Sequence, residues 1–326
     1  MGQVRLLHVS DLHFSYRLNR PNLVNLLETD AADIVNIIGN AFKDRLPEFA
    51  NHNPMLADAL AEFVYLQSDA IDAILITGDL ASTGRSSDLS VAYNYIDASC
   101  TRKWQTQTQE ASLKAGNLPI YLLPGNHDRY QHVLGGVGNT EFETIFSSYW
   151  PRTSKINPFI LTMPDNELLG VICADFSLRK ISDSGLCPPY HQFGRGLVYR
   201  DILDELVSIT RKVQTAGCQA IVWAVHFPPN PPNQASNLAL LRGRKLAEAA
   251  SACNVGYIFS GHIHRKERYK VANTNVNVLS ASTSTANLPS PAKNEIHMVT
   301  IDVSKSIITN LVCQDHVYDE NQQAYI

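Results

Sequence analysis

Short apolar runs recur along the chain and alternate with patterns typical of amphipathic helices. The runs have the length of buried strands and lie at residues 4–9, 73–77, 120–123, 168–174, 220–225 and 255–259. Apolar side chains at helical spacing lie between them, first at residues 56–64 after Pro54 and later at residues 202–213. A third helix is expected over residues 238–253, with Ser236 or Asn237 as its cap. This alternation predicts a mainly parallel sheet covered by helices on both faces.

The pattern changes after Gly261. Runs at residues 268–271, 276–279, 296–303 and 307–312 follow one another closely, with Asn, Ser and Pro between them. This spacing predicts antiparallel hairpins and a second sheet that closes the fold. Large α/β folds often keep a length of 326 residues in one unit, so we expect a single domain over residues 1–326. Within it we expect a helical cap insertion at about residues 19–70 and a β-rich part from about residue 265.

Composition narrows the classes of protein that fit this pattern. Apolar residues make up 44% of the chain and charged residues 18%, which is enough to build a sizeable core. The net charge of -4 supplies no global basic field, so a nucleic-acid partner is not expected. The apolar runs are shorter than the roughly 20 residues of a membrane span, and no signal-peptide pattern is present at the N-terminus. We therefore expect a soluble cytoplasmic protein with free, unpaired cysteines.

Polar motifs follow several of the apolar runs directly. They are Asp11-Leu12-His13, Gly78-Asp79, Gly125-Asn126-His127-Asp128, the single His226 and Gly261-His262-Ile263-His264. A parallel sheet would deliver all of them to one edge. Residues two apart on an extended segment point the same way, so His262 and His264 can share a pocket. Imidazole, carboxylate and amide oxygen suit metal ions, and the convergence predicts a two-metal centre.

Simpler interpretations exist for single members of this set. Asp11 or Asp79 alone would be typical of a turn or a helix cap after a strand, and His226 alone of a satisfied core histidine. Gathering several carboxylates and imidazoles at one sheet edge would, however, cost several kcal/mol unless a cation compensates. The set as a whole therefore favours metal binding.

In their order these motifs resemble those of the calcineurin-like metallophosphoesterase superfamily, which read D-x-H, G-D, G-N-H-[DE], H and G-H-x-H. The resemblance extends from Asp11 to His264 and is strongest to the cyclic-nucleotide phosphodiesterase branch, also called class III. It implies an α/β fold built as a four-layer α/β/β/α sandwich with two mixed sheets. It also implies two divalent or mixed-valence metal ions, with Mn, Fe, Zn and Co all open.

The resemblance assigns roles to individual residues. It implies one metal held by Asp11, His13, Asp79 and His264, and a second held by Asp79, Asn126, His226 and His262. Asp79 would bridge the two metals, together with a hydroxide that attacks phosphorus in line, and His127 would assist the leaving oxygen. One position departs from the pattern of many relatives, where an Asp three residues after the bridging Asp orients the catalytic histidine. This chain has Ser82 there, and a hydroxyl cannot hold an imidazolium as a carboxylate does.

The substrate is less well defined by the sequence. Arg17, Arg129 and Tyr130 follow the first and third motifs, so we expect them to offer positive charge and a ring at the rim of the site. The main hypothesis is a metal-dependent phosphodiesterase acting on small phosphodiesters such as cyclic nucleotides. The alternatives are a nuclease, a phosphomonoesterase or phosphoprotein phosphatase, and a non-catalytic scaffold of the same fold. A homo-oligomer and the physiological substrate stay open.

Overall fold

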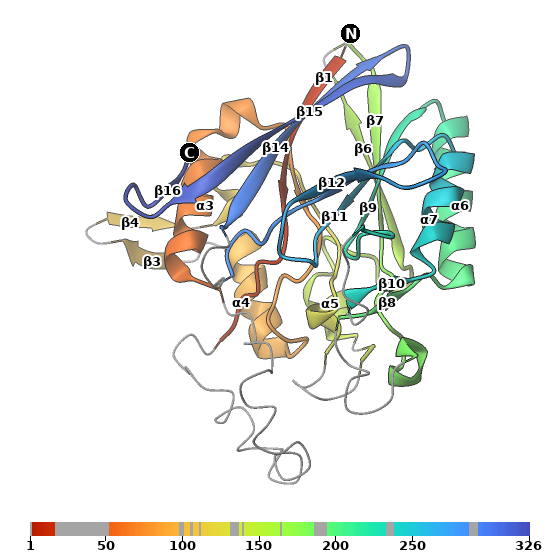
Figure 1. Cartoon of the computed structure of the whole chain (residues 1–326). Helices are drawn as coiled ribbons and strands as arrows, with labels where there is room; N and C mark the ends of the chain where they lie inside the picture. Colours follow the sequence, from red (N-terminus) through yellow and green to blue (C-terminus); the bar gives the residue numbers. More distant parts are fainter. Residues whose placement is uncertain are drawn as a thin grey trace.

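Two six-stranded sheets lie face to face, and helices cover the outer face of each (Figure 1). The structure is a computed structural model. It describes residues 2–16, 52–97, 101–104, 107–110, 112–130, 137–138, 140–163, 165–185, 194–232, 238–286 and 293–326. The expected elements outside these ranges include residues 19–51 of the insertion and the cap at Ser236 or Asn237.

The first sheet has the strand order β16-β15-β14-β1-β2-β5. Its strands are β1 (Gly2–Val9), β2 (Ala73–Ile76), β5 (Ile120–Leu122), β14 (Glu295–Ser304), β15 (Ile307–Asp319) and β16 (Ala324–Tyr325). Strands β1, β2 and β5 are parallel, whereas β14 and β15 are antiparallel to their neighbours. Helices α3 (Pro54–Leu66) and α4 (Ser86–Ile96) lie on the outer side of this sheet (Figure 1). Helix α3 begins where expected, because Pro54 starts it and the side chain of Asn53 accepts the N–H of Met55.

The second sheet has the strand order β12-β13-β11-β9-β7-β6. Its strands are β6 (Ile156–Thr162), β7 (Leu168–Ala174), β9 (Ala220–Val225), β11 (Tyr257–Ser260), β12 (Glu267–Lys270) and β13 (Asn277–Ser280). Helices α6 (Arg200–Thr215) and α7 (Gly243–Ala252) cover its outer face (Figure 1). Strand β6 was not expected from the sequence. It contains Pro158, which an edge strand tolerates because a proline has no N–H to donate.

Shorter elements connect these layers. They are the two-stranded sheets β3 (Thr101–Trp104) with β4 (Gln107–Glu110) and β8 (Gly196–Leu197) with β10 (Leu240–Leu241), helix α5 (Glu141–Ile145), and the 3-10 helices η2 (Ser68–Ala70), η3 (Leu113–Gly116), η4 (His127–Arg129) and η5 (Ile181–Ser184).

Two apolar cores hold the layers together. The larger core lies between the sheets and continues beneath α3 and α4, and Leu6 and Ile301 of the first sheet and Val222 of the second are buried in it. The smaller core lies between the second sheet and its helices and contains Trp223 and Leu206. Strands buried on both faces explain why the sequence shows continuous apolar runs there. The expected sandwich of two mixed sheets between helical layers is confirmed.

Three expectations about elements need correction or restriction. The late strands do not form a separate sheet, because β12 and β13 join the second sheet and β14 to β16 join the first. The third helix begins at Gly243 instead of residue 238, since Leu240–Leu241 pairs with β8 before the helix starts. Helix α3 lies within the expected insertion at 19–70 but buries Leu60 and Val64 in the larger core.

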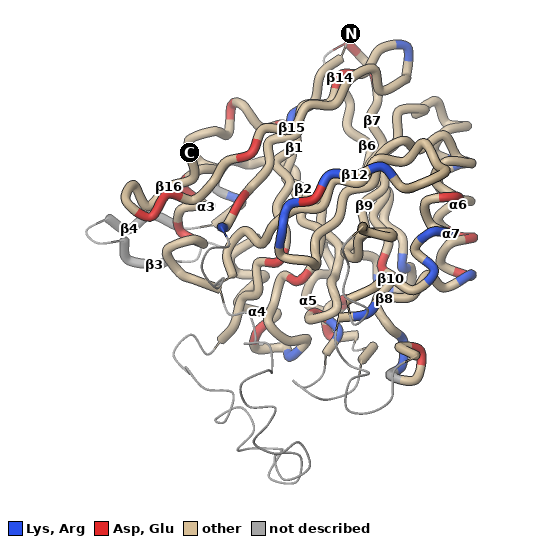
Figure 2. The backbone as a smooth tube through the Cα atoms, in the orientation of Figure 1, with Lys and Arg blue, Asp and Glu red and all other residues tan. Residues whose placement is uncertain are grey.

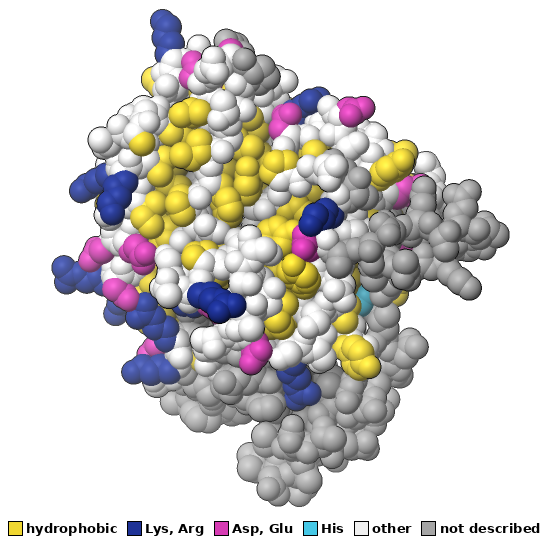
Figure 3. Space-filling view, turned by 180° about the vertical axis from the view of Figure 1, so that it is seen from behind, with side chains coloured by type: hydrophobic (Ala, Val, Ile, Leu, Met, Phe, Trp, Pro, Cys, Tyr) yellow, Lys and Arg dark blue, Asp and Glu magenta, His cyan; other side chains and the backbone are white. Residues whose placement is uncertain are grey.

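The two sheets also meet through polar and aromatic contacts at their borders. Lys266 and Arg268, near and on β12, form ion pairs with Asp315 of β15, and Figure 2 shows the basic and acidic positions on these segments. Hydrophobic side chains gather on the face shown in Figure 3. The edge strands β5 and β6 meet through the stacked rings of Tyr121 and Phe159. The described cysteines, Cys173, Cys218, Cys253 and Cys313, are free thiols. Among the described helices, none has the length and apolar character that a bilayer crossing requires.

Candidate metal centre

The polar motifs meet at the carboxyl ends of strands from both sheets. Loops after β1, β2 and β5 of the first sheet carry the first three motifs, and loops after β9 and β11 of the second carry the last two. The structure brings seven side chains expected to bind metal into one group, in which all but the half-buried His264 are buried: Asp11, His13, Asp79, Asn126, His226, His262 and His264. Parallel strands deliver their carboxyl ends to one edge of each sheet, which explains how distant segments converge.

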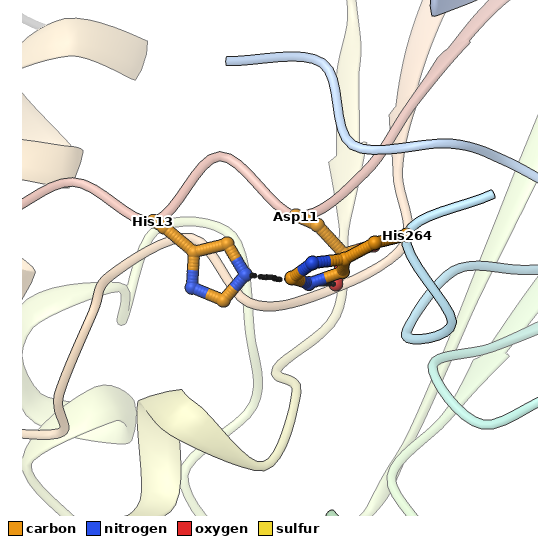
Figure 4. A group of neighbouring side chains, drawn as sticks. All are labelled: Asp11, His13 and His264. Carbon is orange, nitrogen blue, oxygen red and sulfur yellow. Dashed lines mark hydrogen bonds and ion pairs between the residues drawn. The ribbon is translucent and has the colours of Figure 1, made fainter. Parts of the chain in front are cut away.

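The first cluster contains Asp11, His13 and His264 (Figure 4). The Nε2 atom of His264 lies 3.0 Å from Nε2 of His13 and 3.2 Å from Oδ1 of Asp11. Metal bonds of about 2.0 to 2.2 Å place neighbouring nitrogen and oxygen ligands roughly 3 Å apart. The ring nitrogens and the carboxylate therefore have the spacing of ligands around a common point.

The second cluster contains Asp79, His226 and His262, with Asn126 beside them. The Nε2 atom of His226 lies 3.2 Å from Oδ2 of Asp79 and 3.0 Å from Oδ1 of Asn126. The same Oδ2 atom of Asp79 lies 3.9 Å from Nε2 of His13 in the first cluster. Asp79 thus stands between the two clusters, in the place that a bridging ligand requires.

A cation fits this site because several of its polar atoms are buried without another partner. Among the described residues, neither ring nitrogen of His262 has a hydrogen-bond partner, and the side chain is 5% exposed. Oδ1 of Asp11 is also buried without a hydrogen bond. Buried polar atoms are normally satisfied, since leaving them bare costs free energy. Metal ions at the two clusters would remove that cost.

The backbone that carries these side chains is not extended, which corrects the reasoning from spacing. Left-handed φ angles occur at Asp11 (54°), His13 (51°), Asp79 (52°), His262 (73°) and His264 (52°). Such angles are uncommon outside glycine and are often found at functional sites. As a result His262 and His264 face different clusters of the same group, because His264 belongs to the first cluster and His262 to the second.

Two motif glycines are required by close approach. A Cβ atom at Gly125 would lie 2.1 Å from Oδ1 of Asp79, and one at Gly261 would lie 1.8 Å from Oγ of Ser10. Both distances are far below van der Waals contact. The glycines therefore allow the loops to pack directly against the candidate metal ligands and their neighbours.

The electrostatics among these side chains favour the protonation states in which most of them can bind a cation. Burial opposes ionisation of Asp79, but the charges of His226 and His127 outweigh it and hold the pKa of Asp79 well below its ordinary value. Burial, with the charge of His226, lowers the pKa of His262 to about 3 and keeps it neutral. Burial also disfavours charge on His226, but Asp79 prevails and raises the pKa of His226 to about 9. His226 must therefore release a proton before it binds a cation.

His127 lies beside both clusters and is held by backbone groups. Its Nδ1 atom lies 2.9 Å from the carbonyl oxygen of Ser82, and its backbone N–H donates to Oδ1 of Asp79 at 2.8 Å. A carbonyl only accepts, so Nδ1 carries the proton in this contact. The Ser82 hydroxyl instead donates to the carbonyl of His13 at 2.7 Å. The backbone carbonyl of Ser82 therefore orients His127.

Asp128, the last residue of the third motif, has a role that the sequence did not reveal. Its carboxylate accepts the N–H groups of Leu80, Ala81 and Gly125 at 3.2, 2.8 and 2.8 Å. Burial and the nearby charge of Asp79 raise the pKa of Asp128 to about 7. Asp128 ties the loop after β2 to the loop after β5, and so fixes Asp79 relative to His127.

A hydroxyl-rich segment at residues 280–285 holds the first motif, and sequence reasoning missed it. Thr283 Oγ1 donates to the carbonyl of Asp11 at 2.5 Å, and Thr285 Oγ1 donates to that of Leu12 at 2.6 Å. The hydroxyl groups satisfy the carbonyls of a loop whose backbone makes no regular ladder there. The signal was present in the sequence as a run of Ser and Thr directly after an apolar strand.

The two described residues that were expected at the substrate rim are buried instead. Arg129 is 2% exposed, and its guanidinium pairs with Glu143 at 2.5 Å and Asp175 at 2.8 Å. Tyr130 is 8% exposed, and its hydroxyl accepts the side-chain N–H of Asn126 at 3.0 Å. Both side chains are therefore buried beneath the site and do not line its rim, because the local chain turns them inward. Arg17 lies outside the described residues.

A further group of potential ligands lies away from this site. His297, Cys313 and Asp315 are close enough to surround an ion. Arg268 and Lys266 already pair with Asp315, however, and His297 Nδ1 lies 2.7 Å from the same carboxylate. These neighbouring cations oppose a metal ion, so the group is an ion-pair network between the sheets.

Several solved structures are similar to this chain. The fold is similar to that of a dimetal phosphatase from Danio rerio, at 13% identity and a TM-score of 0.53, covering 96% of this chain and 99% of that one. The protein TT1561 of Thermus thermophilus matches at 11% identity and a TM-score of 0.45, covering 97% of this chain and 99% of that one. The sulfate thiohydrolase SoxB of Thermus thermophilus matches at 16% identity and a TM-score of 0.48, covering 97% of this chain and 56% of that one. No curated protein matches the sequence.

The family comparison covers most of the chain. The family model described as calcineurin-like phosphoesterase matches residues 4–266. The matched region includes every motif of the two clusters, from Asp11 to His264. Members of this family typically use a dinuclear metal centre, which agrees with the paired ligand clusters. The chain belongs to the calcineurin-like phosphoesterase family.

Proposed function

We propose that the protein is a dinuclear metal-dependent phosphodiesterase that hydrolyses small phosphodiesters such as cyclic nucleotides. The observation that carries the proposal is the position of Asp79, whose Oδ2 atom faces His226 at 3.2 Å and His13 at 3.9 Å. A carboxylate in that position can serve two cations at once. The family supports phosphoric ester hydrolysis, and the choice of a diester is our own inference.

The residues present would hold two cations in distinct surroundings. Asp11, His13, Asp79 and His264 would hold one, and Asp79, Asn126, His226 and His262 the other. When bound, the cations neutralise phosphate oxygens and make water a nucleophile at neutral pH. Mixed nitrogen and oxygen donors accept Mn, Fe, Zn or Co, so the donor set leaves the metal open.

His127 is the group placed to move a proton. Its Nδ1 proton is committed to the carbonyl of Ser82, which leaves Nε2 as the nitrogen that exchanges a proton with a substrate. A proton delivered from Nε2 to the departing oxygen would avoid expelling an alkoxide. The contact from its backbone N–H to Asp79 fixes this ring relative to both clusters.

The charge around the site supports a diester over a monoester. A phosphodiester carries one negative charge, whereas a phosphomonoester carries close to two at neutral pH, because its second pKa is about 6. Arg129 would be the natural partner of that extra charge, but Glu143 and Asp175 already neutralise it. The net charge of -4 also disfavours long polyanionic substrates.

Paired chromogenic substrates test the proposal. We expect Mn2+-loaded protein to hydrolyse bis-p-nitrophenyl phosphate with a higher kcat/KM than p-nitrophenyl phosphate, and to lose both activities after treatment with EDTA. A panel of cyclic nucleotides, nucleotide diesters and phospholipid diesters then ranks the substrates. Faster hydrolysis of the monoester would overturn the proposal in favour of a phosphomonoesterase.

The role of His127 has its own test. In His127→Ala we expect a loss of about 10²-fold or more for a diester with an alkyl leaving group, and a smaller loss for a nitrophenyl diester, whose leaving group needs no proton. Ser82→Ala is the matched control, because it keeps the backbone carbonyl that holds His127. Equal losses for both leaving groups in His127→Ala would contradict proton donation.

A further inference from the structure

The hydroxyl of Tyr130 lies behind the second ligand cluster, on the side of Asn126 away from His226. We propose that Tyr130 is a positioning residue that turns the amide of Asn126 so that its oxygen faces the second metal position. The proposal rests on metal binding as set out in the proposed function. It concerns a residue that does not itself contact a metal or a substrate.

Asn126 needs an orienting partner because its two amide ends have nearly the same shape. Only the oxygen can bind a cation, since an amide NH2 group donates and has no available lone pair. In the structure Oδ1 lies 3.0 Å from Nε2 of His226, while Nδ2 donates to the hydroxyl of Tyr130 at 3.0 Å. The residue is 3% exposed, so solvent does not replace a lost partner.

The side of the amide that faces His226 sets the choice between its two ends, and Tyr130 then holds the NH2 end in place. His226 Nδ1 lies 2.7 Å from the carbonyl of Thr77, so that nitrogen carries a proton and Nε2 is the nitrogen that faces the cluster. An NH2 group turned toward this side would face the cation position and be repelled. On the other side, the hydroxyl oxygen of Tyr130 accepts the NH2 group that a phenylalanine could not accept.

Tyr130 also joins a second part of the same metal position. Its hydroxyl oxygen accepts the backbone N–H of Gly194 at 3.3 Å. Gly194 lies directly against His262, because a Cβ atom there would be 3.0 Å from Cε1 of that ring. One hydroxyl thus contacts Asn126 directly and, through Gly194, the segment packed on His262. Both residues belong to the second cluster.

Removing the hydroxyl should therefore weaken one metal position more than the other. Partners that orient a ligand typically change metal affinity by about 10- to 100-fold. We expect a loss of this size at the second position in Tyr130→Phe, and a change of less than about threefold at the position built by Asp11, His13 and His264. The phenylalanine keeps the ring and therefore the packing.

The experiment titrates chelator-stripped protein with Co2+ and follows its visible absorption, with calorimetry for the two affinities. Tyr95→Phe is the matched control, because Tyr95 is also buried and its hydroxyl donates to a backbone carbonyl, that of Ala57. Thermal unfolding of both metal-free variants checks that each is folded. Affinities in Tyr130→Phe that equal those of Tyr95→Phe at both positions would overturn the proposal.

A second background separates orientation from general packing. In Asn126→Asp both side-chain oxygens can bind a cation, so the orientation no longer matters. There we expect Tyr130→Phe to cost less than about threefold, and a full 10- to 100-fold loss would show that Tyr130 acts by another route. Wild-type protein that binds two Co2+ ions but hydrolyses no phosphate ester would refute the proposed function and leave this inference intact. Wild-type protein that binds no metal would refute both.

Discussion

Replacing Arg129 by Met tests whether the arginine beside the third motif is a buried structural cation. Methionine has a similar length and keeps the apolar contacts, including those to Phe142 beneath the guanidinium. It removes the charge that neutralises Glu143 and Asp175. The substitution therefore isolates the electrostatic part of this network.

The structure sets the size of the effect. Arg129, Glu143 and Asp175 have side-chain exposures of 2%, 8% and 3%, so the two carboxylates would lose most of their compensation in a dry environment. Lys155 remains as a partner of both, at 2.9 and 3.4 Å. Breaking a buried ion pair from one side costs about 3 to 5 kcal/mol. With an unfolding entropy of about 0.7 kcal/mol per kelvin for 326 residues, this lowers Tm by about 4 to 7 °C.

Scanning calorimetry at neutral pH measures this shift in Tm. The control is the shift caused by breaking an exposed ion pair. Arg244 pairs with Glu248 at 2.9 Å, but the two side chains are 61% and 52% exposed. For Arg244→Met we expect a cost of about 0.5 kcal/mol or less, because solvent screens such pairs. The same variants also test the earlier expectation of substrate contact, which predicts a raised KM in Arg129→Met.

The pH dependence of this difference in Tm provides a result that could refute the reasoning. Burial would raise the pKa of Asp175, but Arg129 and Lys155 outweigh it and lower the pKa below its ordinary value. A lowered pKa contributes stability that is present above about pH 4 and is lost as the pH falls below it. The difference in Tm between wild type and Arg129→Met should therefore shrink below pH 4. A difference that stays constant, or one no larger than that of Arg244→Met, would refute the reasoning.

Three further expectations concern the site itself. Asp79→Asn should bind fewer than two metal equivalents by elemental analysis and lose hydrolysis, because it removes the charge shared by both clusters. With the pKa of His226 at about 9, metal affinity should rise with pH up to that value. Calorimetry in two buffers should then show one more proton released by wild type than by His226→Asn at neutral pH. Gly125→Ala should lower stability by several kcal/mol in urea unfolding, because its Cβ meets Asp79 at 2.1 Å.

Sequence patterns predicted the parts of the fold in which local chemistry and burial agree. Strands β7 and β9 lie where the apolar runs placed them, because both faces of each strand are buried. Pairing partners were not predictable in this way. Strand β13 lies parallel to β11 although it follows β12 in a hairpin, and nothing in an apolar run specifies which neighbour it chooses.

The site was predictable as a set of residues but not as a geometry. The motifs identified the side chains that converge, whereas the left-handed backbone at His262 and His264 sends them to separate clusters. The expectation that Arg129 lies at the substrate rim was wrong because its partners were not visible locally. Glu143 and Asp175 lie 14 and 46 residues away in the chain. Burial of a charge depends on such distant partners, and a local pattern of charged residues does not record them.

Each cluster draws its members from both halves of the sandwich. In the first, Asp11 and His13 come from the loop after β1 and His264 from the loop after β11, while the second joins Asp79 to His226. Ions bound there would cross-link the two sheets, which otherwise pack together mainly through apolar contacts. Ion binding would then complete the site and stabilise the contact between the two sheets at the same time. Removing the ions should loosen the loops at this edge of the sheets before it affects the apolar core.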